Sequence, residues 1–356
     1  MTLSAEMQKI LSLARKERAS DIHVVVNLPP LFRINGEIVL VDRPPLSRDE
    51  TAQLCLGLLN AEQRKAFDRD WQLCYSLFDP QLGRFRVALY LHAGNPEMAI
   101  RPVMAQVATR EDLHLPKQVE DLTRLSGGLV LITGPTGSGK TTTMNYMIDL
   151  LNSERRCKIV AIEDPVEFIH QRKKAIIIQQ ELHTDVKSFA KALIHVLRQN
   201  PDVICIGEMR DIDTTETALI AAETGHLVIA TCHTSNAVQT VERIVSIFPE
   251  NKQPQIFMQL ANTLQGIIAQ RLIPSIDKKD RCLAVELLLM TAAARKHIRD
   301  QQLHLLVNVI QTGRRQGMMG MDDSLLELYQ AGQITYDAAL SNAHDPITLR
   351  DHMHKG

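Results

Sequence analysis

The stretch GPTGSGKTT, residues 134–142, decides the fold of the longer part of this chain. It follows the apolar run GLVLIT, precedes the helical run MNYMIDLL, and matches the pattern G-x-x-x-x-G-K-[ST]. Its glycines let backbone N–H groups turn toward phosphate oxygens, and the helix that starts there adds the positive end of its dipole. We therefore predict a phosphate-binding loop in which Lys140 neutralises phosphate charge and the Thr141 hydroxyl binds Mg²⁺. The predicted loop residues are Gly134, Pro135, Thr136, Gly137, Ser138, Gly139, Lys140, Thr141 and Thr142.

Further short apolar runs follow the loop, separated by helical sequence: KIVAIED, DVICIGE, HLVIATCH and CLAVELLLM. Runs that are apolar on both faces are typical of parallel strands covered by helices. This part of the chain is therefore predicted to be an α/β domain built on a parallel sheet. Ligands of such sheets bind at the carboxyl ends of the strands, so the first polar residues after each run are the candidate site residues.

Acidic residues end two of these runs. Glu208 follows DVICIG, where a carboxylate can hold the attacking water of a phosphoryl transfer, directly or through Mg²⁺. The alternative for Glu208 is an ion pair with Arg210 or a cap on the next helix. Glu163 follows KIVAI and is predicted to orient Mg²⁺ or a water molecule; its alternative is a helix N-terminal acid or a structural salt bridge. The predicted metal ligands are thus Thr141, Glu163 and Glu208.

Two histidines, His226 and His233, bound the run LVIATC. Along a strand at ~3.3 Å per residue they lie about 23 Å apart, and their odd spacing sends them to opposite faces. They therefore do not share one metal ion. His233 follows the carboxyl end of the strand and is predicted to contact the γ-phosphate of a nucleotide, whereas His226 is predicted at a subunit or domain contact. The alternative for both is an ordinary capping or hydrogen-bonded histidine.

Length, composition and charge limit the classes of protein to which this chain can belong. The chain has 356 residues, enough for two domains, and a formal net charge of -1, which argues against wholesale binding of nucleic acid or anionic membranes. No apolar run approaches the roughly 20 residues that span a bilayer, and the start MTLSAEMQKI has no signal-type segment. The six cysteines form no CxxC pair, so no zinc or redox motif is indicated. We expect a cytoplasmic protein that meets the membrane only through partners.

The first hundred residues have a different pattern and are predicted to form a small α+β domain, residues 1–103. A linker is predicted over 104–115 and the α/β domain over 116–356. An amphipathic helix is expected from Leu3 to Ala14, another helix near Thr51–Asp68, and strands in GRFRVALYL and MAIRPV. In the first of these strands Arg84 and Arg86 share one face. From composition alone, this face is expected to be exposed to solvent.

Four segments together resemble one family. GPTGSGKTT, AIEDPVEF, GEMRD and TGHLVIATCHT resemble the Walker A, Asp box, Walker B and His box of the type II/type IV secretion ATPases. ASDIH and PPLFRINGEI resemble that family's N-terminal PAS-like domain. VIQTGRRQGMMGMDDSLLELYQAGQIT and AHDPITLR resemble its pilus retraction branch. The four-cysteine zinc insert of assembly and secretion relatives has no counterpart in the sequence.

This resemblance implies a RecA-like P-loop ATPase core with a smaller N-terminal PAS-like domain, binding ATP and Mg²⁺. It implies that Glu208 is the catalytic glutamate, that Glu163 assists it, and that His226 and His233 form the His box. Arginines of the first domain reach the nucleotide as fingers in relatives; the candidates are Arg86, Arg101 and, behind them, Arg84. The resemblance also implies a homohexamer at the cytoplasmic face of the inner membrane. Its expected partners are an inner-membrane pilus platform protein and a paralogous retraction ATPase.

The sequence departs from the family pattern at two places. Gln179-Gln180-Glu181 stands where relatives have an Asn-Gln-Arg-Glu-like stretch, and Ala293-Ala294-Arg295-Lys296-His297 replaces a more aliphatic retraction motif. Two alternatives to a retraction motor are kept. One is a nucleic-acid or plasmid-transfer ATPase on the same core. The other is an accessory paralogue that acts mainly by interaction.

Overall fold

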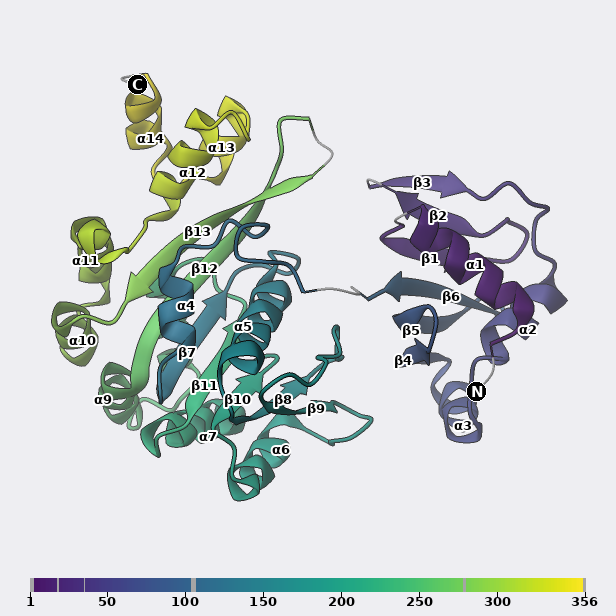
Figure 1. The fold of residues 1–356 in the computed structure, drawn as a ribbon, viewed down its shortest axis with the longest axis horizontal. Coiled ribbons are helices and arrows are strands. Elements are labelled where there is room, and N and C mark those ends of the chain that lie inside the picture. The colour runs from purple at the N-terminus through teal and green to yellow at the C-terminus, as the bar shows by residue number, and fades with distance from the viewer. Residues whose placement is uncertain (1–2, 18, 35, 104–106, 278–279, 355–356) are drawn as a thin grey trace. The chain divides into compact units, whose positions relative to one another are not determined.

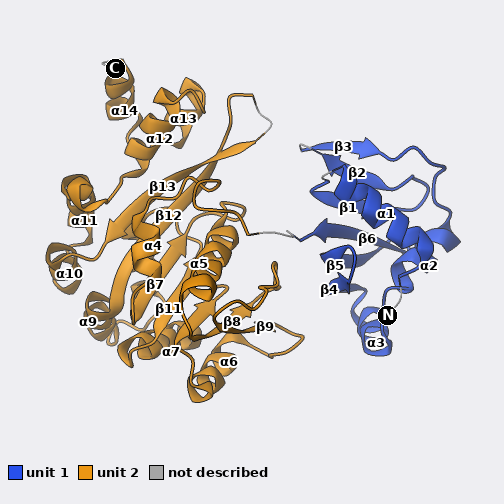
Figure 2. Cartoon of the chain, in the orientation of Figure 1, with its two compact units in different colours: residues 1–106 blue, residues 107–356 orange. Residues whose placement is uncertain are grey.

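The computed structural model describes residues 3–17, 19–34, 36–103, 107–277 and 280–354. The chain divides into two compact units, residues 1–106 and 107–356 (Figure 2). Part of the predicted linker 104–115, residues 104–106, lies outside the described residues. The rest belongs to unit 2, where Leu115 is buried and Val107 and Leu113 pack against the same core.

Unit 1 is an α+β unit (Figure 1). Its described strands form one sheet in the order β3-β2-β1-β6-β5-β4, with antiparallel neighbours throughout. Its elements are α1 (Ala5–Lys16), β1 (Asp21–Val24), β2 (Leu31–Ile34), β3 (Glu37–Leu40), α2 (Arg48–Leu56), α3 (Ala61–Asp70), β4 (Gln72–Asp79), β5 (Gly83–His92) and β6 (Asn95–Pro102).

The first helix confirms the predicted amphipathic pattern. Ser4 caps α1, accepting a hydrogen bond from the N–H of Met7, and the helix buries one face in the core of unit 1. The helix predicted near Thr51–Asp68 is instead two helices. Each has its own capping box, one at Ser47 and one at Asn60, and α2 ends at Gly57. Local capping chemistry thus divides the predicted helical stretch into two helices.

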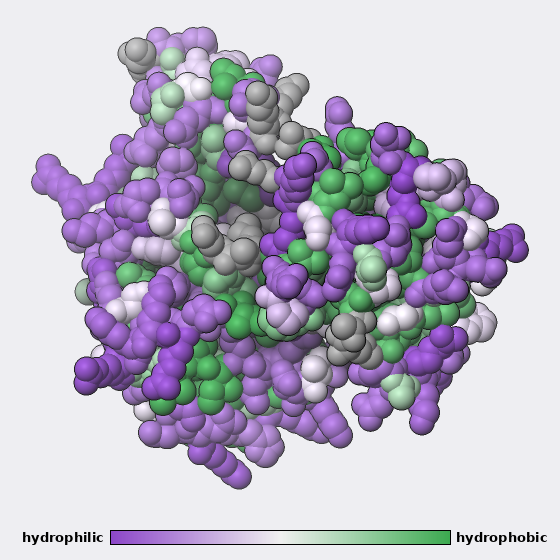
Figure 3. Space-filling view, turned by 45° about the vertical axis from the view of Figure 1, so that its right-hand side comes forward, coloured by the Kyte–Doolittle hydropathy of each residue, from purple (hydrophilic) through white to green (hydrophobic). Residues whose placement is uncertain are grey.

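The surface of unit 1 carries large apolar side chains, and three of them, Ile38, Val39 and Leu40, follow one another on β3. Leu40, Trp71 and Phe78 are exposed, and Figure 3 shows hydrophobic residues interspersed with hydrophilic ones on the face in view. Single exposed apolar residues such as Trp71 and Phe78 are normal on a protein surface. Among the described residues of the chain, no helix is long and apolar enough to cross a bilayer.

Unit 2 is built on one mixed sheet in the order β13-β12-β7-β11-β10-β8-β9. Its first elements are α4 (Gln118–Thr123), β7 (Gly128–Thr133), α5 (Lys140–Glu154), β8 (Lys158–Glu163), β9 (Ile176–Glu181), α6 (Phe189–Val196), η1 (Leu197–Gln199), β10 (Val203–Ile206), α7 (Ile212–Glu223), β11 (Leu227–Cys232), α8 (Ala237–Ser246) and α9 (Gln253–Thr263). The later ones are β12 (Leu264–Pro274), β13 (Arg281–Leu289), α10 (Ala292–Arg299), η2 (Leu303–Leu305), α11 (Leu306–Thr312), η3 (Gly313–Gln316), α12 (Met321–Gln330), α13 (Tyr336–Asn342) and α14 (Pro346–Met353).

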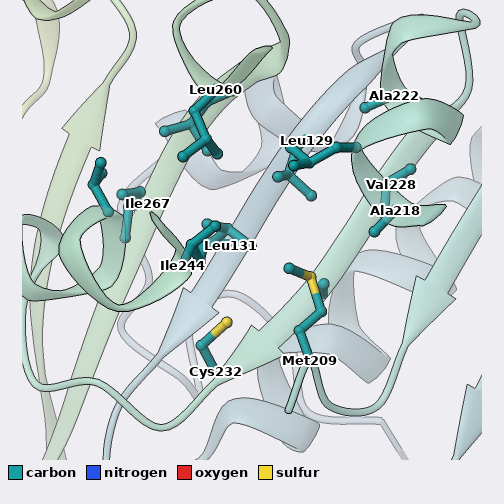
Figure 4. Packing of buried hydrophobic residues seen from close by; sticks show 14 of the residues in the cluster. Leu129, Leu131, Met209, Ala218, Ala222, Val228, Cys232, Ile244, Leu260 and Ile267 are labelled. Carbon is teal, nitrogen blue, oxygen red and sulfur yellow. The ribbon is translucent and has the colours of Figure 1, made fainter. Parts of the chain in front are cut away.

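The central strands are buried on both faces, as the unbroken apolar runs predicted. Successive residues of β7 alternate between two cores: Leu129 and Leu131 pack with α7, α8 and α9, whereas Val130 and Ile132 pack with α4 and α5. Figure 4 shows the first of these cores, with Leu129 and Leu131 facing side chains of α7, α8 and α9. Helices on both faces hold the sheet, and its strands β7, β11, β10, β8 and β9 run parallel.

One strand direction was predicted wrongly. CLAVELLLM forms β13, which is antiparallel to β12 and not part of the parallel set. The reason is the short β12–β13 connection, because a hairpin reverses the chain and parallel pairing needs a long crossover. Beyond this pair, α12, α13 and α14 form a small helical cluster that packs against Ile273 and Ala284.

Candidate active site

The phosphate loop follows β7 and has the backbone that its glycines allow. Gly134, Gly137 and Gly139 have φ values of 146°, 79° and 89°. At Gly134 a Cβ would come within 2.4 Å of both the Gln270 carbonyl oxygen and Ser138 Oγ, so only glycine fits. Gly139 caps α5 without a side chain, which leaves the N–H groups of the first helical turn directed at the loop. The structure thus contains an anion cradle at the predicted place.

Lys140 is the first residue of α5 and is buried, with 8% of its surface exposed. Its Nζ donates to the carbonyl oxygens of Gly134 at 2.8 Å and Pro135 at 3.0 Å, and lies 3.4 Å from His233 Nδ1. Burial lowers the pKa of Lys140, and the charge of Glu208 opposes that effect. The ammonium is therefore held among polar groups that a phosphate can replace.

Glu208, His233 and Lys140 form one connected set. His233 Nε2 lies 2.9 Å from Glu208 Oε1, and Arg210 forms an ion pair with the same carboxylate oxygen. An ammonium has only donors, so the contact with Lys140 requires an unprotonated Nδ1 and places the ring proton on Nε2, where it donates to Glu208. Burial raises the pKa of Glu208, but the hydrogen bonds from Arg210 and His233 outweigh it and hold that pKa below its usual value.

Glu163 ends β8 and has only 1% of its surface exposed. Gln179 Nε2 donates to its Oε1 at 2.9 Å. Glu163, Thr141 and Glu208 line one small cavity of about 40 Å³ beside the loop. Oxygen ligands of this kind suit Mg²⁺, which binds through one or two protein groups plus phosphate oxygens and water. No group of three His, Cys, Asp or Glu side chains arranged to hold a metal by itself occurs in the described part of the chain.

Other predicted site residues lie apart from this set. His226 precedes β11 at its other end, and its Nδ1 donates to the Ala221 carbonyl at 3.0 Å. Arg84, Arg86 and Arg101 belong to unit 1, where Arg86 is exposed and is the register partner of Arg101. Arg101 donates to Asp21 Oδ1 through Nε at 2.9 Å and through Nη2 at 2.7 Å.

Sequence reasoning missed Gln179, because its contact with Glu163 depends on the pairing of β9 with β8. A larger groove of about 960 Å³ lies elsewhere, between α8, α11, α12 and α14. None of the predicted site residues is among the described residues that line it.

A phosphate loop, a buried lysine and two acidic ends of parallel strands in a helix-covered sheet define a P-loop ATPase. Comparison with known proteins identifies the family within this class. Residues 2–333 match the model of the family described as Type II/IV secretion system protein, and the chain belongs to that family. It is 38% identical to the type IV pilus ATPase PilU of Pseudomonas aeruginosa, over 97% of this chain and 90% of that protein. It is 37% identical to the type IV pilus retractation ATPase PilT of the same organism, over 96% and 99%.

The crystal structure of the pilus retraction motor PilT with bound ADP superposes with a TM-score of 0.90 at 41% identity, covering 96% of this chain and 98% of that one. The predicted family resemblance and the α/β ATPase core with a smaller N-terminal α+β unit are therefore confirmed. The chain is an ATP-hydrolysing enzyme that binds nucleotide.

Proposed function

We propose that this chain is a Mg²⁺-dependent motor that couples ATP hydrolysis to retraction of type IV pili, and so to pilin disassembly and twitching motility. It works as a homohexamer at the cytoplasmic face of the inner membrane, on a pilus platform protein. Similarity to retraction motors over nearly the whole chain supports this function. The observation that carries the chemistry is the place of His233, in contact with both Lys140 and Glu208.

The side chains divide the work of hydrolysis. Lys140 binds the β- and γ-phosphates. To do so, its ammonium group gives up its hydrogen bonds to the two loop carbonyl oxygens. Glu208 accepts the proton of the attacking water, and its lowered pKa keeps it ionised for that task. His233 lies beyond β11, next to the phosphate loop, and links the lysine to the glutamate. Thr141, Glu163 and Glu208 hold Mg²⁺ directly or through water. Bound Mg²⁺ neutralises the charge that develops on the phosphoryl group.

The proposed domain movement depends on arginines of unit 1. Arg86 and Arg101 face one another across β5 and β6, and residues that pair in this way share one face of a sheet. We assign them the role of arginine fingers, with Arg84 behind them. ATP then favours the arrangement in which these guanidinium groups reach the phosphates, and hydrolysis removes that preference. His226 is assigned to a contact between subunits or domains.

An accessory retraction ATPase is a second candidate function. The observation that keeps it is that the chain is as similar to PilU, which is named a type IV pilus ATPase without mention of retraction, as to the retraction ATPase PilT, at 38% and 37% identity. In this role the chain works beside a paralogous motor and contributes mainly by interaction.

Deletion and complementation in the native host test both candidates. A deletion strain that is hyperpiliated and does not twitch supports retraction, whereas a bald strain indicates assembly and refutes it. Complementation with Glu208→Gln then separates the roles: failure to restore twitching supports the motor, and full restoration supports the accessory subunit. Turnover of the purified protein that needs nucleic acid, with a steep salt dependence, would instead favour a nucleic-acid motor.

A further inference from the structure

Both the nitrogen and the oxygen of the Gln179 side-chain amide form hydrogen bonds near Glu163. Its Nε2 donates to Glu163 Oε1 at 2.9 Å and to the Phe168 carbonyl at 2.7 Å, and its Oε1 accepts the His170 N–H at 3.1 Å. The parallel register of β8 and β9, which pairs Ala161 with Gln179, places the amide there. We propose that Gln179 is a positioning residue that orients the Glu163 carboxylate and holds the loop 164–170 against β9. This inference rests on the proposed role of Glu163 in hydrolysis.

The chemistry of an amide suits this task. Glu163 is buried, and a buried carboxylate needs hydrogen-bond donors. An arginine or lysine would supply a donor together with a positive charge, which would compete with Mg²⁺ for the carboxylate. The neutral amide of Gln179 fixes the orientation of the carboxylate and leaves its negative charge available for the metal ion or a water.

The loop after Glu163 forms further hydrogen bonds with neighbouring elements. Glu181, two residues beyond Gln179 on the same face of β9, accepts the Val166 N–H at 3.1 Å. His170 Nε2 donates to Asn145 Oδ1 at 3.0 Å, and Asn145 lies one turn after Thr141 on α5. The loop therefore connects the helix of the phosphate loop with β9, and Gln179 joins Glu163 to that connection.

Gln179→Met tests the proposal, because it keeps the length of the side chain and removes both donors and the acceptor. We expect kcat to fall about 10- to 100-fold, the size of effect that follows from misplacing a catalytic group by about 1 Å. The KM for ATP should change less than threefold, since Lys140 and the loop backbone are untouched. Gln180→Met is the matched control: the Gln180 side-chain oxygen is buried without a hydrogen-bond partner in the part of the chain that the structure describes. Its kcat should stay within twofold of wild type.

A second readout needs no turnover. Hydrogen exchange of the His170 amide in the nucleotide-free protein should rise in Gln179→Met and not in Gln180→Met. Gln179→Glu keeps an acceptor for the His170 N–H and loses the donors to Glu163 and to the Phe168 carbonyl, so it should slow kcat. This variant also serves if Gln179→Met does not fold. Unchanged His170 exchange in folded Gln179→Met would overturn the proposal.

A double-mutant cycle with Glu163→Gln completes the test. We expect Gln179→Met to change kcat less than twofold once Glu163 is Gln, because there is no longer a carboxylate to position. An equal loss in both backgrounds would show that Gln179 acts elsewhere. If Glu163→Gln is slow and Gln179→Met is not, only the positioning role falls. If Glu163→Gln itself turns over like wild type, the role of Glu163 falls and the positioning role with it.

Discussion

Replacement of Glu208 by Gln is the sharpest test of the site. The side chain is 15% exposed, and its Oε1 lies 2.9 Å from His233 Nε2. An amide of the same size keeps an acceptor for His233 but no longer takes a proton from water. General-base catalysis contributes about 10²–10⁴ in rate, so kcat should fall by that factor, equivalent to roughly 3–5 kcal/mol of barrier. Affinity for ATP should change less than threefold, because the contacts of Lys140 with the loop do not involve Glu208.

Phosphate release at saturating Mg²⁺ and ATP measures the rate, and titration with a fluorescent, non-hydrolysed ATP analogue measures the affinity. Glu216→Gln is the control. Glu216 lies on α7 and forms an exposed ion pair with Lys252, so this substitution makes the same chemical change at the surface. Surface ion pairs of this kind contribute little to stability. Turnover of Glu208→Gln within threefold of wild type would remove Glu208 from the chemistry and return it to the structural pairing with Arg210.

Four further substitutions have expected outcomes. Lys140→Ala should abolish binding of the ATP analogue by titration, and normal affinity would exclude the phosphate loop as the nucleotide site. Arg86→Ala and Arg101→Ala should each slow phosphate release by up to ~10³–10⁵ while affinity stays within threefold, and unchanged rates in both would mean a solvated strand face. Burial lowers the pKa of His170 from 6.5 to about 4, so the unfolded chain takes up a proton first as pH falls, and stability drops by about 3 kcal/mol between these pH values. His170→Gln should flatten that acid limb in denaturant unfolding measured from pH 7.5 to 4.5, and an unchanged slope would contradict the neutral, buried ring.

Much of unit 2 could be predicted because its signals are local. The phosphate loop specifies its own backbone through glycines at positive φ, and four apolar runs became β7, β8, β10 and β11. Two strands were not anticipated. β9 is a half-buried edge strand, and β12 carries the buried polar residue Gln270, which donates to Thr143 at 2.6 Å. A polar residue paired inside a core breaks the apolar pattern by which a strand is recognised in sequence.

The sequence by itself determined the four strands β7, β8, β10 and β11 and where each ends. It also determined that Lys140, Glu163, Glu208 and His233 follow or end these strands. Only the tertiary structure decided which ends are neighbours. The strand order β7-β11-β10-β8 differs from the order along the chain, and it brings His233 to Lys140 across 93 residues of sequence separation. Strand order depends on how helices pack on both faces and on which crossovers the chain can make, and neither is encoded in a short segment.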